Sequence, residues 1–182
     1  MKYLTLVLAL LFFSIAYSQE SRAPRQVTLD IEKAIKANIE KDVVQLRDKL
    51  AKQGTNKESV EFQADTLRIE RYMDQYIQYD YSTVGMRTAA NDAAEKYDTL
   101  LNKYYQKLLA TLKPEDKPAL VHAEKAWIVF KDKELALQSV LSKDEYSGGG
   151  TIQQLISSSF YLEIIKQRAI TLYNLYSSGW EN

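Results

Sequence analysis

The side chains that could do chemistry are few, and none has the spacing of a catalytic motif. His122 is the only imidazole, and the chain has no cysteine, so disulfides, thiolate metal sites and cysteine nucleophiles are excluded. The chain has no HExxH, GxSxG, GxGxxG or GxxxxGK[ST] motif, the marks of zinc hydrolases, serine hydrolases and nucleotide-binding proteins. Its many carboxylates do not single out an acid–base pair. We therefore predict no catalytic residue, no metal site and no cofactor.

Three charged residues interrupt otherwise apolar helical stripes, namely Asp65, Glu134 and Arg168. Such residues either form a buried polar site or pair between helices, since a buried charge normally has a partner. We favour pairing between helices. If the last two helices form a hairpin around residue 147, position 168 lies opposite position 126. Arg168 then contacts Glu124 or stacks on Trp127.

The most irregular segment is SKDEYSGGGT, over residues 142–151. Its candidates for contact with a partner are Asp144, Glu145, Tyr146, Gly148 and Gly149. An exposed aromatic residue beside glycines suits a binding loop, because such loops often carry function. The same composition also suits a plain flexible connector.

Tyrosine is enriched, with 13 in the chain. Four of them cluster at the end of the second predicted helix, namely Tyr72, Tyr76, Tyr79 and Tyr81. Their rings could stack on a glycan or form a protein interface. The alternative is that they pack at the seams between helices. We keep this surface as a second candidate site.

The elements that position these residues are predicted to be helices. Apolar residues recur every three or four positions over residues 31–50, 58–80, 90–112, 120–141 and 161–175. No stretch shows the alternation of a strand. The sequence therefore predicts an all-α fold, an antiparallel helical bundle of about five helices with no sheet.

Breaks between the predicted helices follow turn-forming residues. The apolar pattern stops at residues 82–85, and Pro114 is predicted to end the third helix and open the fourth. Glu115 and Asp116 then lie in the first turn of the fourth helix, where carboxylates are favoured. Thr151, after the glycine triplet, is a suitable N-cap for the last helix.

The first residues are typical of a secretory signal peptide. Lys2 precedes an apolar run over residues 4–15, and Ala16 and Ser18 fit a small-residue cleavage site. The run is far shorter than the ~20 residues that span a bilayer. We expect a periplasmic or secreted bacterial protein with no stable membrane anchor after cleavage. The formal net charge of +0 argues against nucleic-acid binding.

Two motifs in the second half of the chain follow one another in a characteristic order. DTLLNKYY contains Asp98, Asn102 and Tyr105, AEKAWIVFKDKE contains Trp127, Asp132 and Glu134, and Gly148, Gly149 and Arg168 follow. In this order they resemble the N-terminal domain of the LprI-like lysozyme inhibitor family over residues of about 86–176. Leu135 and Phe160 stand where relatives often have cysteine, and Lys131 stands where they have arginine.

The resemblance implies a small secreted helical domain whose named member inhibits lysozyme. We expect seven motif residues to determine the fold and not to be inhibitory contacts, namely Asp98, Asn102, Tyr105, Trp127, Asp132, Glu134 and Arg168. With it we predict four segments: a signal peptide (1–18), a disordered mature N-terminus (19–26), a helical hairpin (27–85) and the LprI-like domain (86–182). The hairpin and the domain are expected to pack as one globular unit.

The predicted function is protection of the cell wall by inhibition of lysozyme or another cell-wall hydrolase. In this interpretation the segment over residues 142–151 blocks the cleft of the enzyme. The alternative is a non-catalytic envelope module that binds peptidoglycan or a periplasmic protein through the tyrosine cluster. A third interpretation is an immunity protein against a wall-degrading toxin.

Overall fold

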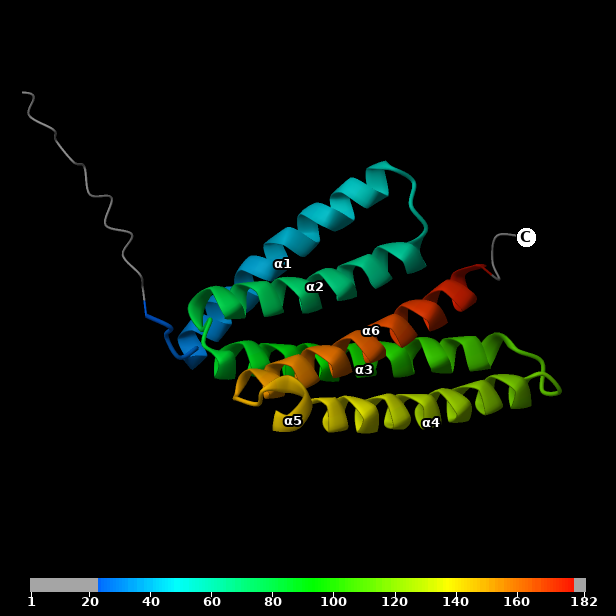
Figure 1. Ribbon diagram of the computed structural model, residues 1–182. Helices are drawn as coiled ribbons and strands as arrows, with labels where there is room; N and C mark the ends of the chain where they lie inside the picture. The colour runs from blue at the N-terminus through cyan, green and yellow to red at the C-terminus, as the bar shows by residue number, and fades with distance from the viewer. Residues whose placement is uncertain (1–22, 179–182) are drawn as a thin grey trace, which may run out of the picture.

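The computed structural model describes residues 23–178, which form six helices and no strand (Figure 1). The helices are α1 (Leu29–Lys52), α2 (Lys57–Tyr79), α3 (Thr83–Thr111), α4 (Lys117–Leu141), α5 (Asp144–Ser147) and α6 (Ile152–Ser178). This confirms the all-α prediction for the described residues. The helix beyond the five predicted is α5, a single turn inside the segment expected to be a loop. The predicted signal peptide and residues 19–22 lie outside the described residues.

Side-chain caps explain where three of the helices begin. Thr28, Asn56 and Ser82 each accept a hydrogen bond from the backbone N–H three residues later, which satisfies a donor that the helix itself leaves open. The predicted break at residues 82–85 is therefore the beginning of α3, with Ser82 as its N-cap. The short link between α2 and α3 reverses the direction of the chain.

The predicted start of the fourth helix is wrong by one turn. Residues 114–116 form a turn instead of the first helical turn, with the N–H of Asp116 donating to the carbonyl of Lys113 at 3.0 Å. The helix begins at Lys117, and Pro118 lies in its first turn. The missing N–H of a proline costs no helical hydrogen bond at that position. Pro118 thus marks the start of α4 better than Pro114 does.

Each long helix runs antiparallel to the next long helix along the chain, but the most extensively packed pair, α3 and α6, runs parallel (Figure 1). The parallel direction follows from contacts in which the residue numbers increase together along both helices. Arg87 donates to Gln154 near the two N-termini, and the rings of Tyr104 and Tyr173 lie 5.1 Å apart further on. The helices run parallel because α4 carries the chain back to the start of α3.

The hydrophobic core has two parts that α2 connects. The larger part lies between α3, α6 and α2, where Phe62 of α2 stacks on Tyr173 at 3.7 Å and meets Tyr104 edge-on at 5.4 Å. The smaller part lies between α1 and α2 and contains Ile35, Ile39, Val43, Ala64 and Tyr72. Aromatic contacts of this kind add to the gain from burial, so α2 is held on the second half of the chain.

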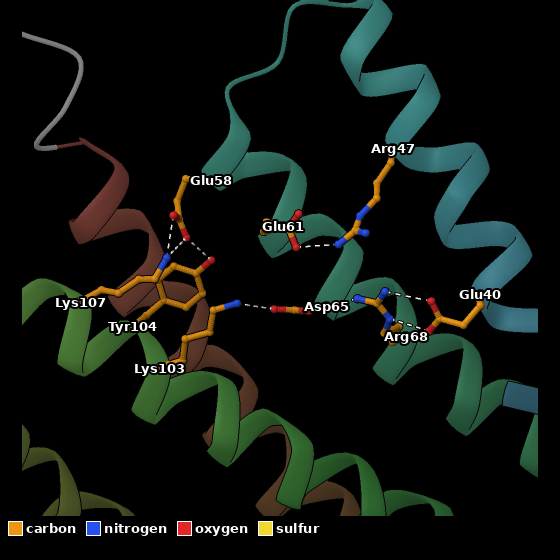
Figure 2. A network of polar contacts seen from close by, with 9 residues as sticks. All are labelled: Glu40, Arg47, Glu58, Glu61, Asp65, Arg68, Lys103, Tyr104 and Lys107. Carbon is orange, nitrogen blue, oxygen red and sulfur yellow. Dashed lines mark hydrogen bonds and ion pairs between the residues drawn. The ribbon is translucent and has the colours of Figure 1, made fainter.

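A network of polar contacts joins α2 to α3 (Figure 2). Lys103 of α3 bonds Asp65 at 2.6 Å, and Lys107 bonds both oxygens of Glu58 at 2.5 and 2.6 Å. Tyr104 also donates to Glu58, at 2.9 Å. The prediction that Asp65 pairs between helices is confirmed. These carboxylates lie seven residues apart on α2, which places them on one face of the helix.

The opposite side of the same network joins α2 to α1 (Figure 2). Arg47 of α1 bonds Glu61 at 2.6 Å, and Arg68 of α2 bonds both oxygens of Glu40 at 2.7 and 3.0 Å. A two-pronged guanidinium–carboxylate contact fixes orientation as well as distance. It therefore sets the register of α1 on α2.

The stability of this network is expected to fall in acid because of Glu58. Burial would raise the pKa of Glu58, but hydrogen bonds from Lys107 and Tyr104 outweigh it, and the pKa lies below its ordinary value of 4.5. A carboxyl group whose pKa is lower in the folded than in the unfolded state stabilises the fold at pH values above its unfolded-state pKa. This stabilisation is lost as the pH falls through the folded-state pKa. We expect Glu58→Gln to lower the free energy of unfolding at pH 7. The difference in free energy of unfolding between wild type and this variant is expected to shrink below about pH 4.5.

Urea denaturation at several pH values measures this difference. Glu145→Gln, at an exposed position on α5, is the control and should follow wild type throughout. A gap between Glu58→Gln and wild type that stayed constant with pH would contradict the expected role of Glu58.

Candidate functional site

The segment between α4 and α6 has a defined backbone and carries an exposed acidic and aromatic tip. Its one-turn helix, α5, presents Asp144, Glu145 and Tyr146 to solvent, and the side chain of Tyr146 is 62% exposed. Ser147 closes the turn, because its hydroxyl donates to the carbonyls of Ser142 and Lys143 at 3.0 Å. The three side chains are therefore held together in a position that a partner can reach.

Gly148 and Gly149 have a backbone role in this segment. Gly148 ends α5 in the left-handed conformation (φ 75°), and Gly149 continues with φ 72°. A Cβ atom on Gly149 would lie 2.3 Å from Oδ1 of Asp144. Glycine fits both positions because it has no Cβ. These residues position the tip, and Gly149 leaves room for the carboxylate of Asp144.

The second candidate surface is not continuous, because the structure buries Tyr72. Only 6% of Tyr72 is exposed, whereas Tyr76 and Tyr79 are half-buried and Tyr81 is exposed. Burial and the nearby carboxylate of Glu32 raise the pKa of Tyr72 to about 12. Tyr72 belongs to the core between α1 and α2. The alternative of packing at a seam between helices therefore describes Tyr72, and the candidate surface does not include it.

Four of the motif residues gather where α3, α4 and α6 meet. Asp98, Asn102 and Tyr105 of α3 line a cavity of about 430 Å³ together with Trp127 of α4. Asn102 donates to both the carbonyl and the carboxylate of Asp98, at 2.9 and 3.1 Å. The amide and carboxylate are thus already paired with each other within α3.

Arg168 forms the most buried ion pair among residues 23–178. Its Nε and Nη2 donate to Oε2 of Glu124 at 3.0 and 2.6 Å, and the two side chains are 14% and 13% exposed. The guanidinium also lies 5.6 Å from the ring of Trp127. The sequence predicted one contact or the other, and both form. This clamp fixes α4 against α6 and so holds the hairpin that ends in α5.

The other two motif residues on α4 have no such partners. Asp132 is exposed and lies 3.2 Å from Lys131. Glu134 forms no ion pair within residues 23–178, so the expectation of interhelix pairing is wrong there. The reason lies on α6, where Lys166 is the only cation between Ser157 and Arg168. Lys166 instead bonds Glu70 of α2 at 2.6 Å.

Metal-binding side chains do not cluster in the part of the chain that the structure describes. Within residues 23–178, no group of three or more His, Cys, Asp or Glu side chains is placed to bind a metal ion. His122 is exposed on α4. The arrangement found at α5 is suited to contact with another molecule, through two carboxylates and one ring.

A second apolar face on α4 was not predicted from the sequence. Phe130, Leu137 and Val140 are exposed there, although each fits a helical stripe. The signal was present in the sequence, because apolar residues surround this helix on more than one side.

Comparison with known families adds one match. A family model described as lysozyme inhibitor LprI matches residues 76–172. The matched segment runs from the end of α2 into α6 and contains the Arg168–Glu124 clamp and α5. Neither the curated proteins nor the solved structures include a match.

Proposed function

This chain belongs to the LprI lysozyme inhibitor family, and from that premise we propose that it is a binding protein, not an enzyme, that inhibits a lysozyme-type cell-wall hydrolase. The family match carries this proposal. The segment that contacts the enzyme is inferred from exposure and charge at α5.

The tip at α5 suits the cleft of such an enzyme. Tyr146 offers an exposed ring at the turn of the α4–α6 hairpin, and a ring can occupy a subsite that holds a sugar. Asp144 and Glu145 place two carboxylates beside it, which can pair with cations around the cleft of a basic enzyme. The formal net charge of +0 means that attraction depends on these local charges and not on the field of the whole protein.

The clamp supports this role from a distance. An inhibitor gains affinity when its contact segment is rigid before binding. Arg168 and Glu124 hold α4 on α6, and Ser147 with the glycines fixes the turn between them. We therefore assign the clamp a positioning role and the tip the contact role.

The alternative of a peptidoglycan-binding tyrosine surface has less support. It needs several accessible rings, but Tyr72 is buried and Tyr76 and Tyr79 are half-buried. Tyr81 is exposed and belongs to the link between α2 and α3. That link lies at the same end of the bundle as α5 (Figure 1).

We also propose that the protein acts outside the cytoplasm, on the pattern of residues 1–18. No helix within the described residues 23–178 is long and apolar enough to cross a membrane. A periplasmic or secreted location places the protein where cell-wall hydrolases act.

Variants of the tip test the proposed contact. Tyr146→Ala is expected to weaken inhibition by tenfold or more, because buried aromatic anchors dominate many interfaces. Asp144→Asn with Glu145→Gln is expected to weaken it at least several-fold through lost charge pairs. The measurement is the concentration of the protein that halves the rate of lysis of cell-wall substrate by lysozyme.

The chain offers a matched control at the other end of α4. Glu115 and Asp116 are also adjacent and exposed, so Glu115→Gln with Asp116→Asn makes the same change in charge. This control should inhibit like wild type. Equal loss in both double variants, or no loss in either, would show that the tip is not the contact.

A further inference from the structure

One side of α4 carries an apolar seam that the rest of the described chain leaves largely exposed. Its central residue, Phe130, also borders a cavity lined by Phe160 and Ile164 of α6. The seam consists of Ala119, Ala123, Ala126, Phe130, Leu137 and Val140, all of them exposed. Phe130 and Leu137 are 53% and 52% exposed. Leu120 is the one residue of α4 that is buried. Exposed apolar patches of this kind usually mark interaction surfaces.

The spacing of the seam is that of a helix-pairing surface. With Lys133 included, its positions alternate in steps of four and three residues over residues 119–140. This is the heptad pattern of a coiled-coil seam, in which each side chain packs between residues of a facing helix. The partner that the seam fits is therefore another helix with a matching heptad.

The order of small and large side chains along the seam indicates which helix this partner is. The small residues Ala119, Ala123 and Ala126 occupy the first half, and the large residues Phe130 and Leu137 occupy the second. We propose that the seam pairs with the same seam of a second copy of this chain, antiparallel, with Phe130 on the two-fold axis. In this arrangement Leu137 of one copy packs on Ala123 of the other.

Charge and size both disfavour the parallel arrangement. Parallel copies would place Lys133 against Lys133 of the second copy, and like charges across an interface are unfavourable. They would also place alanine against alanine and leave a void. In the antiparallel arrangement Lys133 lies against Ala126, where its methylene groups can cover the alanine while its ammonium group reaches solvent. A two-fold axis pairs each surface with itself, as in most homodimers.

The available area sets the expected strength. The smallest specific interfaces bury about 1,200 Å² in total, or about 600 Å² from each copy, and a seam of six apolar residues on one helix belongs to this small class. We therefore expect a reversible dimer whose population changes with concentration. The seam ends at Val140, before the tip at α5, so the tip is not one of the surfaces that the dimer pairs.

Sedimentation equilibrium of the purified chain tests whether the dimer exists. The mass is expected to rise from one chain toward two with concentration in the micromolar range. Phe130→Lys is expected to weaken association at least tenfold, with helix content unchanged because Phe130 is exposed. Leu175→Lys, at an exposed position of α6 outside the seam, is the matched control and should associate like wild type.

Engineered cysteines test the direction of pairing without background, because the chain has no cysteine of its own. Phe130→Cys should cross-link to itself under oxidation or with a short bis-maleimide. An equal mixture of Ala123→Cys and Leu137→Cys should cross-link, whereas neither does so alone. Self-linking of Ala123→Cys at the level of the mixture would overturn the antiparallel arrangement. A single-chain mass at every concentration, or association that survives Phe130→Lys, would overturn the proposal.

Discussion

Tyr104→Ala is expected to lower the free energy of unfolding by about 4 kcal/mol, in the range for aromatic residues truncated in a core. Tyr104 is fully buried and lies where α2, α3 and α6 meet. Its ring contacts Phe62 and Tyr173, and its hydroxyl donates to Glu58 at 2.9 Å. The substitution leaves a cavity and removes one of the hydrogen bonds to Glu58. Urea denaturation followed by far-UV circular dichroism measures the change.

Two further variants separate the ring from its hydroxyl group. Tyr104→Phe keeps the packing and removes only the hydrogen bond, so it should cost about 1 kcal/mol. Leu175→Ala, at an exposed position, should change stability by less than about 0.5 kcal/mol. If Tyr104→Ala were no more destabilising than Tyr104→Phe, the ring would not hold α2 on α3 and α6.

Arg168→Ala is expected to lower the free energy of unfolding by about 3 kcal/mol, because it leaves the carboxylate of Glu124 buried without its partner. The two side chains are almost covered and are bonded at 2.6 Å, and the guanidinium also stacks on Trp127. Removing Arg168 therefore takes away a charge pair and a packing contact together. Urea denaturation is again the measurement.

A double-mutant cycle isolates the pair. Glu124→Gln, Arg168→Met and the double variant give the coupling energy between the two side chains. The double variant should be more stable than Arg168→Met alone, because no charge is then left unpaired. Lys33→Ala is the control for a surface ion pair, since Lys33 and Asp30 lie 4.0 Å apart and are largely exposed, and it should have little effect. Additive effects of Glu124→Gln and Arg168→Met would contradict the clamp.

The helices could be predicted because their signal is local. Apolar residues at helical spacing define a stripe without knowledge of the rest of the fold. The register of α4 on α6 could also be predicted, because a hairpin fixes which positions face each other once its turn is known. The contacts of Arg168 with both Glu124 and Trp127 follow from that arithmetic.

The features that were missed depend on neighbours that the local sequence does not specify. Tyr72 lies on a stripe, but only the packing of α1 on α2 decides that it is buried. Glu134 lacks a partner because the hairpin places it opposite Phe160, and residues 157–163 of α6 contain no cation. The exposed seam of α4 was not recognised, since a stripe does not show whether a second helix covers it.

The sequence predicted that the candidate contact residues are exposed together, but not that they form a helical turn. Asp144, Glu145 and Tyr146 lie together on an exposed tip, yet that tip is a helical turn closed by Ser147 and ended by Gly148. A single turn is too short to produce a periodic signal. Its order depends on the left-handed backbone at Gly148 and on hydrogen bonds that composition does not reveal.

Lysis of cell-wall substrate by lysozyme in the presence of the purified chain shows whether the protein is an inhibitor, with C-type and G-type enzymes assayed side by side. We expect inhibition of at least one type that rises with the amount of the chain and is complete near equal molar amounts. Circular dichroism of the same sample verifies that the protein is folded and helical. If a folded sample in large molar excess leaves both enzymes fully active, the protein does not inhibit lysozyme and the proposed function is wrong.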